Sequence, residues 1–151
     1  MKTDTPRPIR LDDYWPSPYL IDTVDLDIVL HPTHTRVRSR IAVRLNPAHR
    51  GKSGPLRLDG ENLKLESIKI DDRELDEGGY RQTSHHLTIP KTPAASFTLE
   101  TVVTVDPEAN TALQGLYRTR GVFCTQCEAE GFRRITFFLD RPDILSVYTT
   151  R

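Results

Sequence analysis

Apolar and polar residues alternate along much of the chain. Apolar side chains recur at nearly every second position over residues 24–30, 37–45 and 97–105, with Ser39 and Thr101 as the exceptions. A period of two places successive side chains on opposite faces of a sheet, so each run predicts a half-buried strand. Shorter apolar runs bounded by turn signals predict further strands over residues 56–58, 63–65, 68–70 and 86–89. We therefore expect an all-β fold, a twisted β-sandwich or saddle.

The pattern changes after Pro107. Residues 110–117 are small and polar and indicate a loop, and residues 122–125 predict a short strand. Residues 130–136 have helical character and predict one short helix near the C-terminus. Residues 144–150 then predict a last strand, which begins as the sequence stops.

Three segments follow from these patterns. Residues 1–18 contain four prolines among charged residues and predict an extended lead-in. Residues 19–143 carry the strands of one β domain. Residues 144–151 form the start of a strand for which the preceding sequence offers no evident partner, so we expect it to be unpaired within this chain.

Composition narrows the function classes. The 151 residues include 21 Lys+Arg and 21 Asp+Glu, so the net charge is zero at pH 7. This balance argues against a nucleic acid or an anionic membrane as partner. The sequence has no apolar run long enough to span a membrane and no signal-peptide core near Met1. We therefore expect a cytoplasmic protein.

A run of arginines resembles a phosphate-binding stripe. Arg36, Arg38, Arg40 and Arg44 share one face of their strand. The preceding strand offers carboxylates at Asp22, Asp25 and Asp27. Opposite charges on neighbouring strands commonly pair on a solvated face, so we predict ion pairs rather than a phosphate site.

Residue types alone give no catalytic constellation. The sequence contains no H-E-x-x-H, no G-x-S-x-G and no glycine-rich phosphate loop. His31 and His34 flank Pro32 in a predicted turn and are expected to be surface residues. Cys124 and Cys127 form one C-x-x-C, which is half of a zinc site, a redox pair, or two incidental thiols. We predict no metal site and no cofactor in this chain.

One long segment resembles a known family. Residues 125–143 read TQCEAEGFRRITFFLDRPD. This is similar to the zinc aminopeptidases of the aminopeptidase N type, whose common form is T-Q-x-E-x-x-x-x-R-x-x-F-P-C-x-D-E-P. The shared positions are Thr125, Gln126, Glu128, Arg133, Asp140 and Pro142. The departures at 136–138 and at Arg141 look like the bacterial alanyl aminopeptidase branch, as do residues 56–63 and 110–117.

The resemblance implies that this chain is the N-terminal β domain of a longer enzyme. In the family, zinc is held by H-E-x-x-H and a distal Glu in a catalytic domain that these 151 residues do not include. Zinc would then belong to the full-length enzyme, and this domain would have no catalytic activity alone. Its expected partners are that catalytic domain of the same polypeptide and the N-terminus of a peptide substrate.

The resemblance also assigns roles to residues. Gln126 and Glu128 would bind the free α-amino group of the substrate, and a cis peptide bond would join Glu128 to Ala129. Ala129, Arg133 and Asp140 would support the site structurally. Without the motif, Gln126 and Glu128 are two polar residues on one face of a strand.

Two other functions remain open at this point. One is a stand-alone β-sandwich module for peptide binding or another interaction. The other is a zinc or redox module built on the C-x-x-C.

Overall fold

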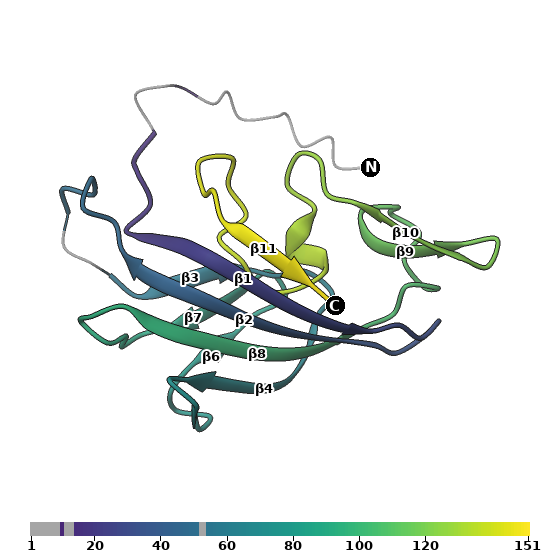
Figure 1. Ribbon diagram of the computed structural model, residues 1–151, viewed down its shortest axis with the longest axis horizontal. Coiled ribbons are helices and arrows are strands. Elements are labelled where there is room, and N and C mark those ends of the chain that lie inside the picture. The colour runs from purple at the N-terminus through teal and green to yellow at the C-terminus, as the bar shows by residue number, and fades with distance from the viewer. Residues whose placement is uncertain (1–9, 11–13, 52–53) are drawn as a thin grey trace.

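Two sheets and a hairpin make up the part of the chain that the computed structural model describes, namely residue 10 and residues 14–51 and 54–151 (Figure 1). The order of the six-stranded sheet is β11 (Val147–Thr150), β1 (Tyr19–Val29), β2 (Thr35–Leu45), β8 (Phe97–Val105), β4 (Lys64–Ile70) and β5 (Arg73–Glu74). The order of the three-stranded sheet is β3 (Leu56–Asp59), β7 (His86–Ile89) and β6 (Arg81–Gln82). The hairpin consists of β9 (Gly115–Thr119) and β10 (Val122–Gln126). The predicted all-β fold is confirmed.

The long strands form where the period-two pattern predicts them. In β2 every second side chain from Thr35 to Val43 is buried, and the arginines between them face outward. In β1 the register with β2 shifts between Ile21 and Thr23, so the buried positions resume at Val24. This irregularity lets a strand with uneven spacing keep its apolar side chains on the core side.

The outward arginines are paired, as predicted. Two of them bind carboxylates of β1: Arg38 lies 3.3 Å from Asp27, and Arg44 lies 2.9 Å from Asp22. The other partners come from elsewhere: Glu66 for Arg36, Glu100 for Arg38 and Asp72 for Arg40. The arginine stripe is therefore part of a charged outer face of the sheet.

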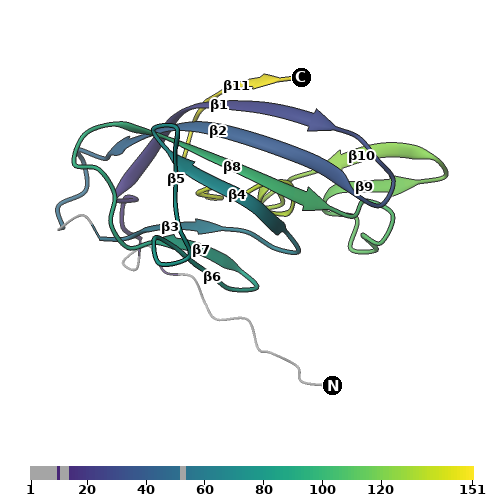
Figure 2. The ribbon, with the colours of Figure 1, turned by 90° about the horizontal axis from the view of Figure 1, so that it is seen from below.

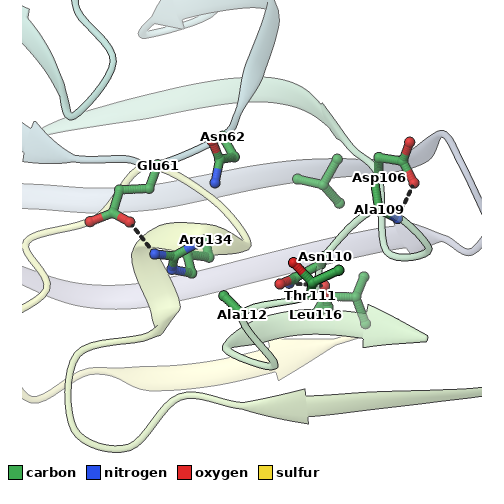
Figure 3. Close-up of a pocket in the computed structure, with 10 residues that line it drawn as sticks. Glu61, Asn62, Asp106, Ala109, Asn110, Thr111, Ala112, Leu116 and Arg134 are labelled. Carbon is green, nitrogen blue, oxygen red and sulfur yellow. Dashed lines mark hydrogen bonds and ion pairs between the residues drawn. The ribbon is translucent and has the colours of Figure 1, made fainter. Parts of the chain in front are cut away.

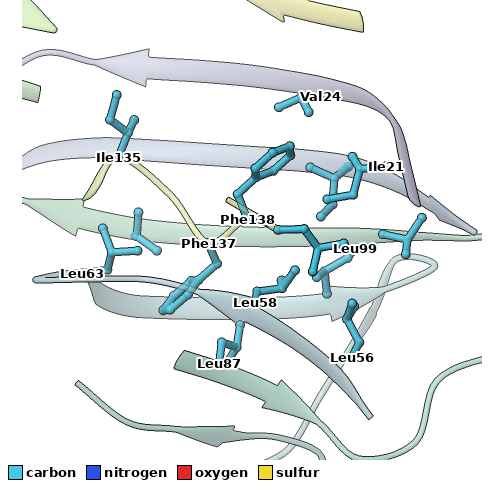
Figure 4. Packing of buried hydrophobic residues seen from close by; sticks show 14 of the residues in the cluster. Ile21, Val24, Leu56, Leu58, Leu63, Leu87, Leu99, Ile135, Phe137 and Phe138 are labelled. Atoms are coloured by element: carbon cyan, nitrogen blue, oxygen red, sulfur yellow. The ribbon is translucent and has the colours of Figure 1, made fainter. Parts of the chain in front are cut away.

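The two sheets form two layers, with the three-stranded sheet beneath the large one (Figure 2). Residues 135–140 are all buried, and they connect the two layers. Figure 4 shows Phe137 pointing toward Leu87 of the small sheet and Phe138 pointing toward Val24 of the large one. Positions 136–138, where the sequence departs from the common family form, thus lie in the core.

The short helix expected over 130–136 is present as a single 3-10 turn, η2 (Phe132–Arg134). Two other predictions about the second half of the chain are wrong. The expected loop over 110–117 contains the start of β9. The last strand is not unpaired, because β11 pairs in parallel with β1, from Thr23 opposite Val147 to Leu26 opposite Thr150.

Most of the predicted lead-in, residues 1–9 and 11–13, lies outside the described residues. The segment from Tyr14 to Pro18 belongs to no strand or helix. Among the described residues, we find no helix with the length and apolar character needed to span a membrane.

Candidate functional site

The residues that the resemblance assigns to the amino group lie in one tight loop. We call residues 126–131 the anchor loop; it runs from the last residue of β10 to the start of η2. The Gly131 N–H donates to the carbonyl oxygen of Cys127 at 2.8 Å and closes the loop. A Cβ atom at Gly131 would lie 2.7 Å from the Gln126 carbonyl oxygen, so the close approach requires glycine.

Both predicted binding side chains are exposed. Gln126 is opposite Gly115 in the hairpin, and its Nε2 donates to the carbonyl oxygen of Glu128 at 3.5 Å. This contact leaves Gln126 Oε1 available as an acceptor. Among the described residues the Glu128 carboxylate has no hydrogen bond or ion pair. The peptide bond from Glu128 to Ala129 is cis, and Ala129 is exposed.

Arg133 and Asp140 meet directly behind the anchor loop. The Asp140 side chain is 9% exposed, and its Oδ2 accepts from the Arg133 backbone N at 3.1 Å and from Nε at 2.8 Å. Arg133 Nη2 also donates to the Asp140 carbonyl oxygen at 3.0 Å and to Glu130 Oε2 at 2.9 Å. Arg133 therefore connects the anchor loop to a buried carboxylate.

A second support comes from residues 59–61, to which the sequence analysis gave no role. The Asp140 N–H donates to Asp59 Oδ2 at 3.2 Å, and the Glu61 N–H donates to the Arg133 carbonyl oxygen at 2.9 Å. Glu61 Oε2 also lies 2.6 Å from Arg134 Nη2. The only sequence signal was the resemblance over 56–63; the contacts themselves span more than 70 positions and leave no local pattern.

Aromatic rings pack beneath the anchor loop. The Phe132 ring packs edge to face against two other rings. Its centroid lies 5.0 Å from that of Phe138 and 5.7 Å from that of Tyr148. Burial raises the pKa of the Cys127 thiol, and the nearby Asp140 carboxylate raises it further. Burial likewise raises the pKa of Tyr148, again with a contribution from Asp140. Within the loop Cys127, and just after it Phe132, thus pack against the hydrophobic core.

The two cysteines do not form a disulfide in this structure. Cys124 and Cys127 are both free thiols and partly buried. Raising a thiol pKa reduces its thiolate fraction, which disfavours a redox role for Cys127. Within residue 10 and residues 14–51 and 54–151, no three His, Cys, Asp or Glu side chains are grouped so that they could hold a metal ion. His31 and His34 lie in an exposed turn with their rings stacked.

The Glu61–Arg134 ion pair lines one part of a cavity of about 370 Å³ (Figure 3). The lining combines polar residues, among them Asn62, Asp106 and Asn110, with apolar ones. Neither Gln126 nor Glu128 contributes to it. The candidate binding residues therefore sit on an open surface rather than in this cavity.

The chain is therefore a two-layer β domain that presents two acceptor side chains, Gln126 and Glu128, on a loop held by buried ion pairs and hydrogen bonds. The model of the family described as Peptidase M1 N-terminal domain matches residues 16–151, and the chain belongs to this family. The resemblance found in the sequence is thereby confirmed.

Among curated proteins, the chain is 53% identical over 151 residues to Aminopeptidase N of Caulobacter vibrioides. The match covers 100% of this chain and 17% of that protein. The chain thus spans only a small N-terminal fraction of a curated relative.

Solved structures have the same fold. The crystal structure of Legionella pneumophila aminopeptidase A in complex with aspartic acid matches with a TM-score of 0.86 and 37% identity, over 94% of this chain and 17% of that chain. A mutant M1 zinc metallopeptidase of Deinococcus radiodurans, bound to a Tyr-Ser-Ala substrate, matches with a TM-score of 0.69 and 17% identity, over 88% and 32% of the two chains. The second likeness concerns the fold alone.

Proposed function

We propose that this chain is the N-terminal part of a zinc-dependent aminopeptidase, in which the anchor loop binds the free α-amino group of a peptide substrate. Family membership supports the enzyme class. The observation that carries the binding role is the exposed Glu128 carboxylate, which no other described residue pairs with and which lies two residues from Gln126 and its amide oxygen.

The chemistry of these two groups suits an ammonium ion. A protonated α-amino group has three N–H donors, and Glu128 and Gln126 supply a carboxylate and an amide oxygen as acceptors. An internal peptide nitrogen is uncharged and has one donor at most. Placed at the same point, it would leave the carboxylate desolvated and without a partner, which costs several kcal/mol. The loop would therefore restrict cleavage to the first residue of a peptide.

The zinc of such an enzyme would be bound outside these residues. The sequence contains no H-E-x-x-H, so the expected ligands belong to the rest of the longer polypeptide. When bound there, zinc would polarise the scissile carbonyl group. The contribution of this chain is to hold the substrate's amino group, and we expect no catalysis by the chain alone.

The rest of the polypeptide is the second proposed partner. Leu145 and Val147, beside the Tyr148 that packs under the anchor loop, are 87% and 70% exposed. Exposed apolar side chains next to a binding loop suit coverage by a further domain. A cytoplasmic location remains a prediction from the sequence.

The test protein is a chimera in which this chain replaces the matching N-terminal segment of the Caulobacter vibrioides enzyme. Glu128→Ala and Glu128→Gln should each lower kcat/KM for a dipeptide by about 100-fold or more, since either change removes the charge that faces the ammonium. Glu77→Gln, at another exposed glutamate, is the matched control and should keep the wild-type value.

Full dipeptide turnover by both Glu128 variants would refute the anchor role. A folded but inactive wild-type chimera would also count against the proposal. A purified chain that binds N-acetylated and free peptides equally well would instead favour a stand-alone peptide-binding module.

A further inference from the structure

We infer that Asp59 is a positioning residue for the amine anchor. It lies at the end of β3, outside the anchor loop and outside the family motif at 125–142. Its carboxylate and its backbone hold the segment that fixes Arg133, and Arg133 in turn holds the loop. This inference rests on the proposed function of Glu128.

The first step runs from the anchor loop to Asp140. Glu130, two residues after Glu128, binds Arg133 Nη2 at 2.9 Å. Arg133 has little freedom, because its backbone N, Nε and Nη2 all bind Asp140. The position of Asp140 therefore sets the position of Arg133, and with it the C-terminal half of the loop.

The second step runs from Asp140 to Asp59. The Asp140 N–H is bonded to Asp59 Oδ2 at 3.2 Å. The backbones of Asp59 and Phe138 bond in both directions, from the Asp59 N–H at 2.7 Å and from the Phe138 N–H at 3.1 Å. Three bonds thus tie one residue of the small sheet to residues 138–140. Loss of the carboxylate would leave the N–H of a buried residue without its partner, which favours a shift of the backbone there.

The third step fixes the Asp59 carboxylate itself. Its other oxygen, Oδ1, lies 3.3 Å from His86 Nδ1, although the two atoms are not aligned as a hydrogen bond. On the opposite side of the ring, His86 Nε2 contacts Arg57 Nη2. A guanidinium group only donates, so Nε2 must accept and the ring proton belongs on Nδ1, facing Asp59. His86 of β7, itself contacted by Arg57 of β3, therefore turns its N–H side toward the Asp59 carboxylate.

Two hydroxamates that differ only in the amino group provide the test. L-alanine hydroxamate and propanohydroxamate both bind a metal ion, and only the first can use the anchor. The ratio of their dissociation constants, measured by calorimetry on the chimera, isolates the contribution of the amine. A variant that merely unfolds part of the sample lowers the binding stoichiometry and leaves this ratio unchanged.

We call the ratio of the dissociation constant of propanohydroxamate to that of L-alanine hydroxamate the amine preference. We expect Glu128→Gln to reduce it by about 10- to 100-fold, the effect of a lost charge-assisted hydrogen bond. Asp59→Ala should reduce it by roughly 3- to 10-fold, because a displaced loop weakens the same contact without removing it. The ratio for Asp59→Asn should lie between those of Asp59→Ala and wild type. The amide oxygen still accepts from the Asp140 N–H, but the amide nitrogen turns a donor toward His86. Asp22→Ala removes a surface ion pair of β1 and should leave the ratio unchanged.

The outcomes separate the two proposals. A wild-type ratio in Asp59→Ala together with a reduced ratio in Glu128→Gln would overturn the role of Asp59 alone. A wild-type ratio in Glu128→Gln would overturn the proposed function itself. If Asp59→Ala fails to fold, the Asn variant decides, and a wild-type ratio in that variant refutes the inference.

Discussion

Two glutamates of the anchor loop have opposite surroundings. Glu130 is engaged by Arg133, whereas Glu128 has no partner among the described residues. Both are exposed acidic residues in one turn, and nothing in their spacing distinguishes them. Arg133 binds Glu130 and Asp140 and makes no contact with Glu128 among the described residues, so the Glu128 carboxylate is free to accept from a ligand. Among the described residues, Glu128 is thus the glutamate of this loop that remains free for the proposed binding role.

Gly131 offers a direct test of the loop geometry. Gly131→Ala would place a Cβ 2.7 Å from the Gln126 carbonyl oxygen and 2.8 Å from the Cys127 Cα. We expect the free energy of unfolding to fall by about 1–3 kcal/mol, the usual cost of overpacking. Urea unfolding of the two purified chains measures this difference.

The matched control is Gly54→Ala, since a Cβ at Gly54 would have no atom within 4 Å. It should change the free energy of unfolding by less than about 0.5 kcal/mol. Equal effects of the two substitutions would contradict the close packing at Gly131.

At the scale of the elements, local patterns predicted the strands with one buried face. β1 and β2 alternate apolar and polar residues because a long strand with one face on the core imposes that period. β9 has no such pattern: it starts at a glycine with a φ of 71° and pairs only with β10. The parallel partner of β11 was missed because strands more than 120 residues apart leave no local signal of pairing.

The central strands of the large sheet carry a testable charge pair. Glu100 of β8 is 8% exposed, and Arg38 of β2 binds it through Nε and Nη2 at 3.0 and 2.7 Å. The hydrogen bonds to Glu100 and the charge of its carboxylate raise the pKa of Arg38, and Asp27 adds a smaller contribution. Arg38→Ala should lower the free energy of unfolding by about 1–2 kcal/mol, since it deprives a buried carboxylate of its main partner.

Arg44→Ala provides the comparison, since Arg44 forms an ion pair with the exposed Asp22. Its effect should stay below about 0.5 kcal/mol, as for other surface ion pairs. Chemical denaturation of both variants gives the two values, and a larger loss for Arg44→Ala would contradict the difference in burial.

For the molecule as a whole, the sequence predicted the class of fold better than the site. Period-two patterns predicted the β domain, which is confirmed, and the motif at 125–142 indicates Gln126 and Glu128 as candidate binding residues, which stays a prediction. Neither could place Asp59 or Glu61 behind the loop, because those contacts arise only when the small sheet packs under the large one. The support of the site is thus a property of the tertiary fold.

Acid should weaken the whole fold through His86. Its pKa lies below the ordinary value of 6.5, because burial disfavours the charged ring and Arg57 repels it. Between about pH 6.5 and the lower folded-state pKa, the unfolded chain therefore binds more protons than the folded chain, so stability falls as the pH decreases through this range. Urea unfolding between about pH 7.5 and about pH 5.5 should show a smaller loss in His86→Gln than in wild type. Equal losses in the two proteins would contradict this assignment.

The course of the chain after the anchor loop has a practical consequence for protein engineering. Within ten residues of Glu128 the backbone lies between the layers, with Phe137 and Phe138 pointing to opposite sides. A short peptide with the sequence of the anchor loop would lack this packing between the two layers. The same sequence inserted into an unrelated protein would lack it too. Specificity for chain ends would have to be transferred together with the entire sandwich.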